Sequence, residues 1–338
     1  MPRAACPGKG TEPWPQEAHP CHCPSPLTAA QVKALHLHEL QNEPELFDFA
    51  FVCVKSYDTK WATLCCRNYL KPDAAFVSFQ NGINEYALAE TVGAENCLGV
   101  AILIAAACFE PGLVERYDTR DSPFHFGEQV GPPSERAGVL VELFERAGVG
   151  GAETIDDLIA ERWAKLSVNC YVNALGGISG LGSSTMRRDK LTVALGTQLS
   201  SEVVKVGRAL GVQIPDFFGI ELDRLVGAAD GNAADKEYMA ERLEIQAGLA
   251  SDEGKASLLQ DVIKGRRTEI EYLNGMVADK GREVGIATPA CDAVVKLVQE
   301  AGIGKLVPSE DNLTLLATAL GMLESADAAP VSATAGRL

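Results

Sequence analysis

Residues 47–82 read FDFAFVCVKSYDTKWATLCCRNYLKPDAAFVSFQNG, and this stretch decides the fold of the chain. It opens with an apolar run, 47–55, rich in β-branched and aromatic residues, as expected of a strand buried on both faces. A helical pattern follows over 57–69, and a second run of the same kind occupies 74–80. A strand, a helix and a strand in this order predict a βαβ unit, and hence a parallel sheet.

Strand and helix patterns continue to alternate beyond this stretch. Helices are predicted over 84–91 and 134–148, and strands over 98–109, 113–118 and 124–128. We therefore predict a doubly wound parallel sheet with helices on both faces, formed by residues 28–155.

The rest of the chain is helical in pattern. Four segments carry the helical spacing of apolar residues: 156–180, 192–211, 256–285 and 289–302. No strand pattern occurs among them, so residues 156–323 are predicted to form an all-helical domain. The two ends differ, because residues 1–27 hold seven of the 17 prolines and residues 324–338 are small and polar. Both ends are predicted to be poorly packed tails.

Composition limits the partners of the chain. With 338 residues, 46% of them hydrophobic, it is long enough for two domains with cores of their own. Its 30 Lys and Arg residues against 46 Asp and Glu give a formal net charge of -16, which argues against nucleic-acid and anionic-membrane partners. No apolar stretch is long enough to span a bilayer, and no secretory signal is evident. We expect a cytoplasmic protein with reduced cysteines.

A nucleotide-binding fingerprint is missing from the sequence. The motif G-x-G-x-x-G should follow a strand and open a helix, but its near matches lie in the proline-rich tail, at Gly8, or after a helix, at Gly180. The sequence around Gly254 lacks the spacing and the Ser or Thr of a phosphate loop. The cysteines and histidines of the tail show no second paired cluster, so we predict no metal site.

A stripe of polar residues runs along the predicted helix 156–180. Lys165, Asn169 and Asn173 are spaced at i, i+4 and i+8, so they lie on one face, while their neighbours are apolar. A stripe that faces solvent is the plainer alternative. We favour a functional cleft, because Asn is unfavourable inside a helix and the surrounding faces offer little other polarity.

A second periodic set lies in the predicted helix 256–285. Four residues recur at every fourth position and should line one face: Ser257, Asp261, Gly265 and Glu269. A glycine in mid-helix costs about 1 kcal/mol relative to Ala, which indicates the close approach of another group at Gly265. An exposed, charged helix stabilised by Glu–Arg pairs explains the pattern equally well.

Polar residues also end the first two predicted strands. Lys55 closes the first strand, and Gln80-Asn81-Gly82 directly follows the second. Ligands of open α/β sheets bind at the carboxyl ends of the strands, so these residues are candidates for contact with an anionic cofactor. A strand end and a tight Asn-Gly turn are the plainer alternatives.

Taken in order, these segments resemble the ketopantoate reductase (2-dehydropantoate 2-reductase) family. The resemblance covers Phe47–Val298 and rests on FDFAFVCVK, SFQNGINE, EPGLVER, ERWAKLSVNCYVN and SLLQDVIKGRRTEIEYLNG. It implies a Rossmann-type NADPH-binding domain, a helical domain, and an active site in the cleft between them. It also implies a small 2-keto acid as the ligand, ketopantoate being reduced to pantoate, and it leaves a homodimer open as the assembly.

The resemblance assigns roles residue by residue. It makes Lys165 and Glu269 catalytic, Asn169, Asn173 and Ser257 substrate-binding, and Lys55 and Asn81 cofactor-binding. The Lys165 ammonium would stabilise the charge that develops on the ketone oxygen and would donate the proton. Glu269 would orient the substrate, and the amides and the serine would bond its hydroxyl and carboxylate groups. The hydride would come from NADPH.

The sequence departs from the family in two places. Ser183 stands where the family commonly carries another pocket Asn, which leaves the identity of the keto acid open. The family's opening strand, Gly-rich turn and first helix have no counterpart in residues 1–46, so the predicted Rossmann-type sheet is incomplete. Two alternatives follow. One is a catalytically impaired or non-catalytic remnant that lacks the dinucleotide fingerprint, and the other is a related reductase for another branched 2-keto acid.

Overall fold

The computed structural model describes residues 33–43, 45–117, 124–148 and 151–323, so the predicted tails at 1–27 and 324–338 lie outside the described residues. The chain divides into two compact units, Met1–Glu45 and Leu46–Leu338. In the first unit the described residues form one 3-10 helix, η1 (Leu37–Asn42). The second unit contains the sheet, the longer helices and the candidate site.

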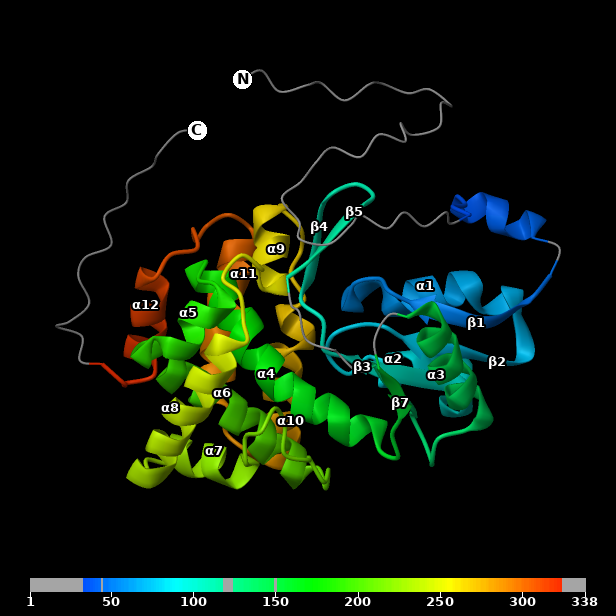
Figure 1. Ribbon diagram of the computed structural model, residues 1–338. Helices are drawn as coiled ribbons and strands as arrows, with labels where there is room; N and C mark the ends of the chain where they lie inside the picture. The colour runs from blue at the N-terminus through cyan, green and yellow to red at the C-terminus, as the bar shows by residue number, and fades with distance from the viewer. Residues whose placement is uncertain (1–32, 44, 118–123, 149–150, 324–338) are drawn as a thin grey trace, which may run out of the picture. The chain divides into compact units, whose positions relative to one another are not determined.

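A five-stranded sheet organises the first part of the second unit (Figure 1). Its strands, in spatial order, are β1 (Phe47–Val52), β2 (Leu70–Ser78), β3 (Cys97–Ile102), β6 (Phe124–Glu128) and β7 (Ala152–Thr154). The pairs β1–β2, β2–β3 and β6–β7 are parallel, and β6 runs antiparallel to β3. The predicted α/β class with a mainly parallel sheet is confirmed.

Helices cover both faces of this sheet, because successive side chains of a strand point to opposite faces. On one face, Phe76 of β2 belongs to a core cluster with Leu88 of α2 (Glu85–Val92). On the other face, Val77 belongs to a cluster with Leu140 of α3 (Glu135–Ala147). The remaining helical elements here are α1 (Thr59–Cys66), η2 (Ser56–Asp58), η3 (Arg67–Tyr69) and η4 (Ala94–Asn96). This two-sided cover is the predicted doubly wound arrangement.

Strand β1 is an edge strand, which corrects the prediction of a strand buried on both faces. Phe47 and Phe51 are 40% and 45% exposed, and Val52 alone in this strand is buried. Within the described residues its backbone pairs with β2 alone. An apolar run shows that a strand can be buried, but its neighbours in the sheet decide whether it is.

The apolar run at 98–109 forms two strands in different sheets, so the prediction of one strand is wrong. β3 ends at Ile102, where its antiparallel pairing with β6 also ends. Residues 103–105 leave the sheet, and β4 (Ala106–Glu110) then pairs with β5 (Leu113–Arg116) in a separate hairpin. Gly112, at φ +81°, lies in the turn of that hairpin.

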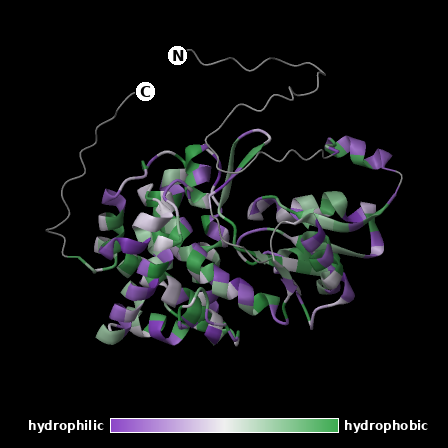
Figure 2. Ribbon diagram, viewed as in Figure 1, coloured by the Kyte–Doolittle hydropathy of each residue, from purple (hydrophilic) through white to green (hydrophobic). Residues whose placement is uncertain are grey.

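The second part of this unit is all-helical in the described residues, as predicted, apart from an isolated bridge between Phe217 and Ile220. Its helices are α4 (Leu158–Ser179), α5 (Ser183–Arg188), α6 (Lys190–Ala209), α7 (Leu222–Ala229), α8 (Ala233–Gly248), α9 (Ser257–Ile263), α10 (Asn274–Val284), α11 (Pro289–Gly302) and α12 (Asp311–Ala319). In Figure 2 green residues lie beside purple ones along these helices, as expected of helices that bury one face. None of the described helices combines the length and the apolar character needed to cross a membrane.

The predicted helix over 256–285 is interrupted, so the expectation of one continuous face is wrong. α9 ends at Ile263, Gly265 adopts a left-handed conformation at φ +63°, and the 3-10 helix η5 (Ile270–Tyr272) precedes α10. No atom lies within 4 Å of the position that a Cβ on Gly265 would take, so this glycine serves the turn and not a close approach. The turn at Gly265, rather than a shared helix face, brings the carboxylates of Asp261 and Glu269 to the same lysine, Lys55.

Helix α4 joins the helical part to the sheet. Asp157 caps its first turn by accepting a hydrogen bond of 2.9 Å from the Ala160 N–H. Two glycines of the sheet let this turn approach closely. A Cβ on Gly127 would lie 2.9 Å from the Leu158 Cβ, and one on Gly99 would lie 2.8 Å from the Leu158 Cδ2. The start of α4 is therefore fixed against β3 and β6, and the helix carries the polar stripe from there into the helical part.

Candidate active site

A pocket of about 250 Å³ lies where α4 passes the turn after β2. Its walls come from α4, from residues 102–106 between the end of β3 and the start of β4, from residues 249–257 up to the first residue of α9, and from α5 and α8. Five of the seven predicted site residues line it: Asn81, Lys165, Asn169, Asn173 and Ser257. The other two, Lys55 and Glu269, form a separate polar cluster next to the same turn.

The polar stripe of α4 faces this pocket, which excludes the alternative of a solvent-facing stripe. Lys165 and Asn173 are each 8% exposed, and Asn169 is half-buried. The Lys165 Nζ donates a hydrogen bond of 3.1 Å to the Asn81 Oδ1. The helical repeat aligns three polar groups along one wall of the pocket.

The charge state of Lys165 is strongly altered by its surroundings in this pocket. Burial, helped by the positive charge of Arg162 and opposed by the negative charge of Glu85, lowers the pKa of Lys165 to about 7. An amine with a pKa of about 7 can hold and release a proton near neutral pH. The structure therefore places an amine that can exchange a proton near neutral pH at the wall of a pocket.

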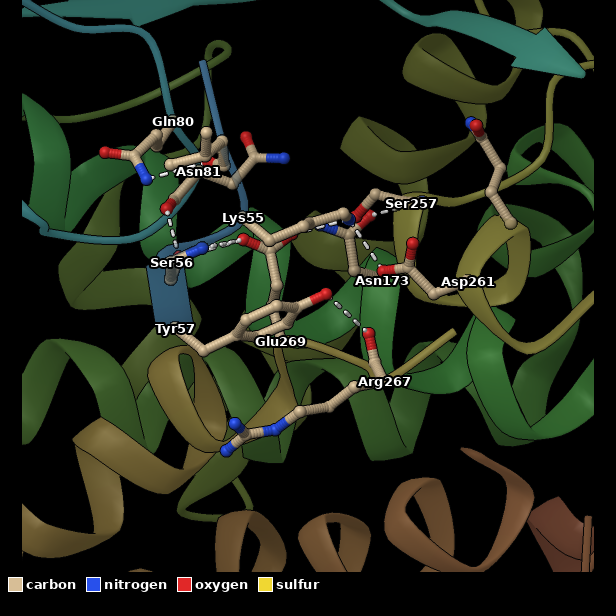
Figure 3. Close-up of polar contacts among 12 residues, drawn as sticks. Lys55, Ser56, Tyr57, Gln80, Asn81, Asn173, Ser257, Asp261, Arg267 and Glu269 are labelled. Atoms are coloured by element: carbon tan, nitrogen blue, oxygen red, sulfur yellow. Dashed lines mark hydrogen bonds and ion pairs between the residues drawn. The ribbon is translucent and has the colours of Figure 1, made fainter. Parts of the chain in front are cut away.

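Two side-chain groups of the pocket wall are buried without a hydrogen-bond partner: the Asn169 Nδ2 and the Ser257 Oγ. A buried polar group left unsatisfied costs about 1–3 kcal/mol. The backbone N–H of Ser257 donates to the Asn173 Oδ1 at 3.4 Å, and this hydrogen bond holds Ser257 in place (Figure 3). Unpaired groups at a pocket are suited to bond polar groups of a ligand.

Lys55 follows β1 and lies between two carboxylates (Figure 3). Its Nζ is 2.6 Å from the Asp261 Oδ2 and 2.7 Å from the Glu269 Oε2. Ser56 fixes the other oxygen of Glu269, because its N–H and its Oγ each donate to the Oε1 at 2.8 Å. We call Lys55, Asp261 and Glu269 the acidic triad, after its two carboxylates. It links the end of β1 to α9 and to the segment that follows α9.

Electrostatics favour the charged form of Lys55. Burial lowers the pKa of Lys55, but the charges and hydrogen bonds of Glu269 and Asp261 outweigh it, so the pKa of Lys55 is raised. Burial raises the pKa of the Asp261 carboxyl, against the opposing influence of Lys55. Lys55 therefore stays cationic, and in this arrangement its charge is directed at the two carboxylates.

The charges that line the pocket are all positive. Lys165, Arg187 and Lys255 contribute to its wall, and no Asp or Glu appears among the described residues that line it. This bias stands out in a chain with a formal net charge of -16. Ser183, which departs from the family pattern, also lines the pocket, and its carbonyl accepts a hydrogen bond of 2.8 Å from the Arg187 Nη1. The pocket is electrostatically suited to a small anion.

The turn after β2 is held in a defined conformation. The Gln80 Nε2 donates to the Val54 carbonyl and to the Thr59 Oγ1, each at 2.8 Å. The Asn84 Nδ2 donates to the Asn81 carbonyl at 2.7 Å. Asn81 is therefore presented at the carboxyl ends of β1 and β2, the position at which open α/β sheets bind ligands.

The described residues fit one end of a dinucleotide and not the other. Asn81 and Lys165 meet beside a pocket with unpaired donors, which suits the reactive nicotinamide end. No glycine-rich turn joins a strand to a helix in the described residues, since the connection from β1 to α1 lacks glycine and that from β2 to α2 contains Gly82 alone. The diphosphate therefore has no backbone cradle there. No cluster of three or more His, Cys, Asp or Glu side chains in the described part of the chain is arranged to hold a metal.

Sequence reasoning missed two residues of this region. Asp261 was noted for its spacing but not as a partner of Lys55, which it meets across 206 positions of the chain. Arg162 was not singled out at all, although it is a charged residue one helical turn before Lys165 in an apolar segment. That position is the signal that identifies it, because a charge beside Trp163 and Leu166 needs a buried partner.

Two family models match the chain, one for each part of the fold. The first, described as ketopantoate reductase PanE/ApbA, matches residues 19–129, and the second, described as ketopantoate reductase PanE/ApbA C terminal, matches residues 157–302. Together they span more than half of the chain. The fold and the matches define an oxidoreductase with a Rossmann-like α/β part and a helical part. The chain belongs to the ketopantoate reductase family.

Individual relatives agree with this assignment. A 2-dehydropantoate 2-reductase of Mesorhizobium japonicum is 30% identical over 217 residues, which are 64% of this chain and 59% of that protein, less than two thirds of its length. One of Archaeoglobus fulgidus is 28% identical over 266 residues, 78% of this chain and 80% of the relative.

Solved structures share the fold. A PanE/ApbA family ketopantoate reductase from Ralstonia eutropha JMP134 has a TM-score of 0.61 at 26% identity, and the match covers 77% of this chain and 78% of that one. A D-mandelate dehydrogenase, solved with NADH and anilino(oxo)acetate, has a TM-score of 0.63 at 19% identity and 78% coverage of both chains. At that identity the second likeness concerns the fold alone.

Proposed function

We propose that this chain reduces a 2-keto acid to the 2-hydroxy acid with a nicotinamide nucleotide, the acid being ketopantoate and the nucleotide NADPH. The observation that carries the proposal is Lys165, a buried lysine whose pKa is about 7, in a pocket lined by cations and unpaired donors. The names of the curated relatives supply the choice of ketopantoate and pantoate.

Lys165 performs the proton chemistry in this proposal. A nicotinamide nucleotide, when bound, supplies the hydride for the keto carbon. Negative charge then develops on the keto oxygen, and the ammonium group of Lys165 stabilises it. The same group donates its proton to that oxygen, which completes the hydroxyl. Asn81 accepts a hydrogen bond from the Lys165 Nζ and so orients the ammonium.

The unpaired donors bind the rest of the acid. The Asn169 Nδ2 and the Ser257 Oγ lack partners in the pocket wall, and a substrate hydroxyl or carboxylate satisfies them. Asn173 positions Ser257 by accepting its backbone N–H. Arg187 and Lys255 add positive potential that favours a carboxylate. Ser183, in the place of the family's Asn, is the residue most able to alter the choice among branched keto acids.

The acidic triad belongs to the cofactor side of the site. Glu269 holds Lys55 and Ser56 at the end of β1, next to the turn that carries Asn81. Its role in the proposal is to fix the two strand ends against the segment after α9. Lys55 and Asn81 would then meet the nicotinamide end of the cofactor.

Steady-state reduction of ketopantoate by the full chain, followed as loss of NADPH absorbance, tests the proposal. We expect saturable turnover and a higher kcat/KM for ketopantoate than for other branched 2-keto acids. A higher kcat/KM for a different acid would assign the pocket to that acid instead. Absence of turnover with every acid in the panel would reject the proposed reductase.

A second candidate function rests on the lack of a glycine-rich turn for the diphosphate among the described residues. A chain without that turn would bind the keto acid but not the nucleotide, and would be a non-catalytic remnant of the family. Titration calorimetry separates the two candidates. The reductase predicts binding of NADPH in the micromolar range or tighter, whereas the remnant predicts heat from ketopantoate and none from NADPH.

A further inference from the structure

Arg162 is a fully buried arginine at the junction of the helical part and the sheet. It lies one turn before Lys165 on α4 and is 1% exposed. Its side chain reaches the carboxyl end of β2 and the start of α2, where Glu85 is also fully buried. We call Arg162 and Glu85 the junction pair.

Within the described residues, the hydrogen bonds of this guanidinium go to the carboxyl end of β2 or to Glu85. The Nη1 donates to the Gln80 carbonyl at 2.8 Å. The Nη2 donates to the Ser78 carbonyl at 3.0 Å and to the Ser78 Oγ at 3.1 Å. The Nε donates to the Glu85 Oε1 at 2.8 Å, and the Nη2 also contacts this oxygen. The fork of donors thus clamps the last residues of β2.

Stability alone does not account for the junction pair. Replacing a buried ion pair by apolar groups of similar volume is often neutral or stabilising. The pair is also imperfectly satisfied, because the Glu85 Oε2 is buried without a hydrogen-bond partner. The absence of a side chain at Gly99 of β3 nevertheless leaves space for the junction pair. A Cβ at this position would lie 2.3 Å from the Glu85 Oε1 and 3.1 Å from the Arg162 Nη2.

The clamp is directly connected to the proton-transfer group. Gln80, whose carbonyl Arg162 holds, immediately precedes Asn81, whose Oδ1 accepts from the Lys165 Nζ at 3.1 Å. Arg162 and Lys165 in turn lie at i and i+3 on one helix, so their side chains are neighbours. A closed circuit of helix, turn and hydrogen bonds therefore fixes the Lys165–Asn81 contact.

We propose that the junction pair is a positioning device for Lys165, in which the Arg162 fork sets the Lys165–Asn81 geometry and the opposite charges of Arg162 and Glu85 both act on the amine. The inference deepens the proposed function and rests on its assignment of Lys165. Other charged groups border the same space: Lys55, Asp261 and Glu269 beside the Asn81 turn, and Arg187 and Lys255 in the pocket wall.

The charges of the junction pair act on Lys165 with opposite signs. The positive charge of Arg162 lowers the pKa of Lys165, and the negative charge of Glu85 raises it. Arg162→Met should therefore raise this pKa, and Glu85→Gln should lower it, each by about one pH unit for a buried charge at this spacing. A purely structural role predicts no such pair of opposite shifts.

The test is the rate at which an amine-reactive reagent labels Lys165 in the full chain as a function of pH, read by mass spectrometry. It reports the pKa of Lys165 whether or not the chain is active, so failure of the inference and failure of the proposed function are distinguishable. Arg282→Met, a change at an exposed arginine of α10, is the matched control and should leave the pKa unchanged.

Two further variants keep the inference testable if Arg162→Met does not fold. Arg162→Lys retains the charge but loses the fork, so the Lys165 pKa should stay within a few tenths of a unit. In an active chain the kcat of this variant should fall about tenfold. The double variant Arg162→Met/Glu85→Gln removes both charges and should bring the pKa back toward the wild-type value. Shifts of the same sign in Arg162→Met and Glu85→Gln, no shift in Glu85→Gln, or a double variant whose pKa lies as far from the wild-type value as that of either single variant would overturn the inference.

Discussion

Gly99 lies on β3 directly against the junction pair, and replacing it with alanine challenges the packing that the site depends on. A Cβ at this position would lie 2.3 Å from the Glu85 Oε1, 2.8 Å from the Leu158 Cδ2 and 3.1 Å from the Arg162 Nη2. All three neighbouring side chains are buried, and Glu85 and Arg162 are held by hydrogen bonds. None of these three side chains can therefore move aside at low cost to make room for the added methyl group.

Two effects determine the size of the destabilisation. Overpacking of a well-packed site costs about 1–3 kcal/mol. Displacement of Glu85 from Arg162 weakens a buried ion pair, whose complete loss costs about 3–5 kcal/mol. We expect Gly99→Ala to lower the free energy of unfolding by about 3 kcal/mol, because the pair is displaced but not removed. Urea unfolding of the full chain, followed by circular dichroism, measures this change.

Gly138 provides a matched control for the same substitution. It lies within α3, and no atom is within 4 Å of the position of its added Cβ. Gly138→Ala should therefore raise the free energy of unfolding by about 1 kcal/mol, through helix propensity alone. If Gly99→Ala were as stable as the wild type, or stabilised like Gly138→Ala, the close packing of β3 against the junction pair would be refuted.

The remaining predictions concern the pocket and the acidic triad. If the protonated form of Lys165 is the proton donor, kcat/KM for reduction should be constant below the pKa of Lys165, at pH about 7. Above that pH, kcat/KM should fall about tenfold per pH unit. A profile that stays constant for about two pH units above the pKa contradicts this role. Ser257→Ala removes a buried hydroxyl without a partner, so it should raise the KM for the keto acid about tenfold. It should also raise the free energy of unfolding by about 1–3 kcal/mol, the cost of the unsatisfied group. An unchanged KM would count against substrate contact. Lys55→Met leaves the Asp261 and Glu269 carboxylates without their cation, so urea unfolding should show that the free energy of unfolding falls by about 3 kcal/mol. Adding Asp261→Asn removes one of the two negative charges and should restore part of this loss. No recovery in the double variant would show that charge is not the cause.

Local periodicity was sufficient to find the face of α4 that lines the pocket. Lys165, Asn169 and Asn173 lie on one helix, and helical geometry fixes their relative positions without any knowledge of the rest of the fold. The strand ends at Lys55 and Asn81 were found for a similar reason, because parallel strands bring their carboxyl ends to one edge. Features whose geometry is set within one element, or by one topological rule, are thus accessible from the sequence.

Features set by distant contacts were not accessible in this way. Arg162 and Glu85 are separated by 77 positions, and no local pattern links them. The exposure of Phe51 depends on what lies beyond β1, and the end of β3 depends on where its pairing with β6 ends. Gly265 satisfied the helical repeat of its neighbours, but its left-handed conformation divided the helix and still brought Asp261 and Glu269 to one lysine.

The central claim is that Lys165 is the proton donor of a 2-keto acid reductase. It is tested most directly by the kcat of ketopantoate reduction with NADPH in the full chain, for the wild type, Lys165→Ala and the exposed control Lys296→Ala, with pantoate identified as the product. The account predicts a loss of about a hundredfold or more in kcat for Lys165→Ala and wild-type turnover for Lys296→Ala. Turnover by Lys165→Ala within a few-fold of the wild type would contradict it.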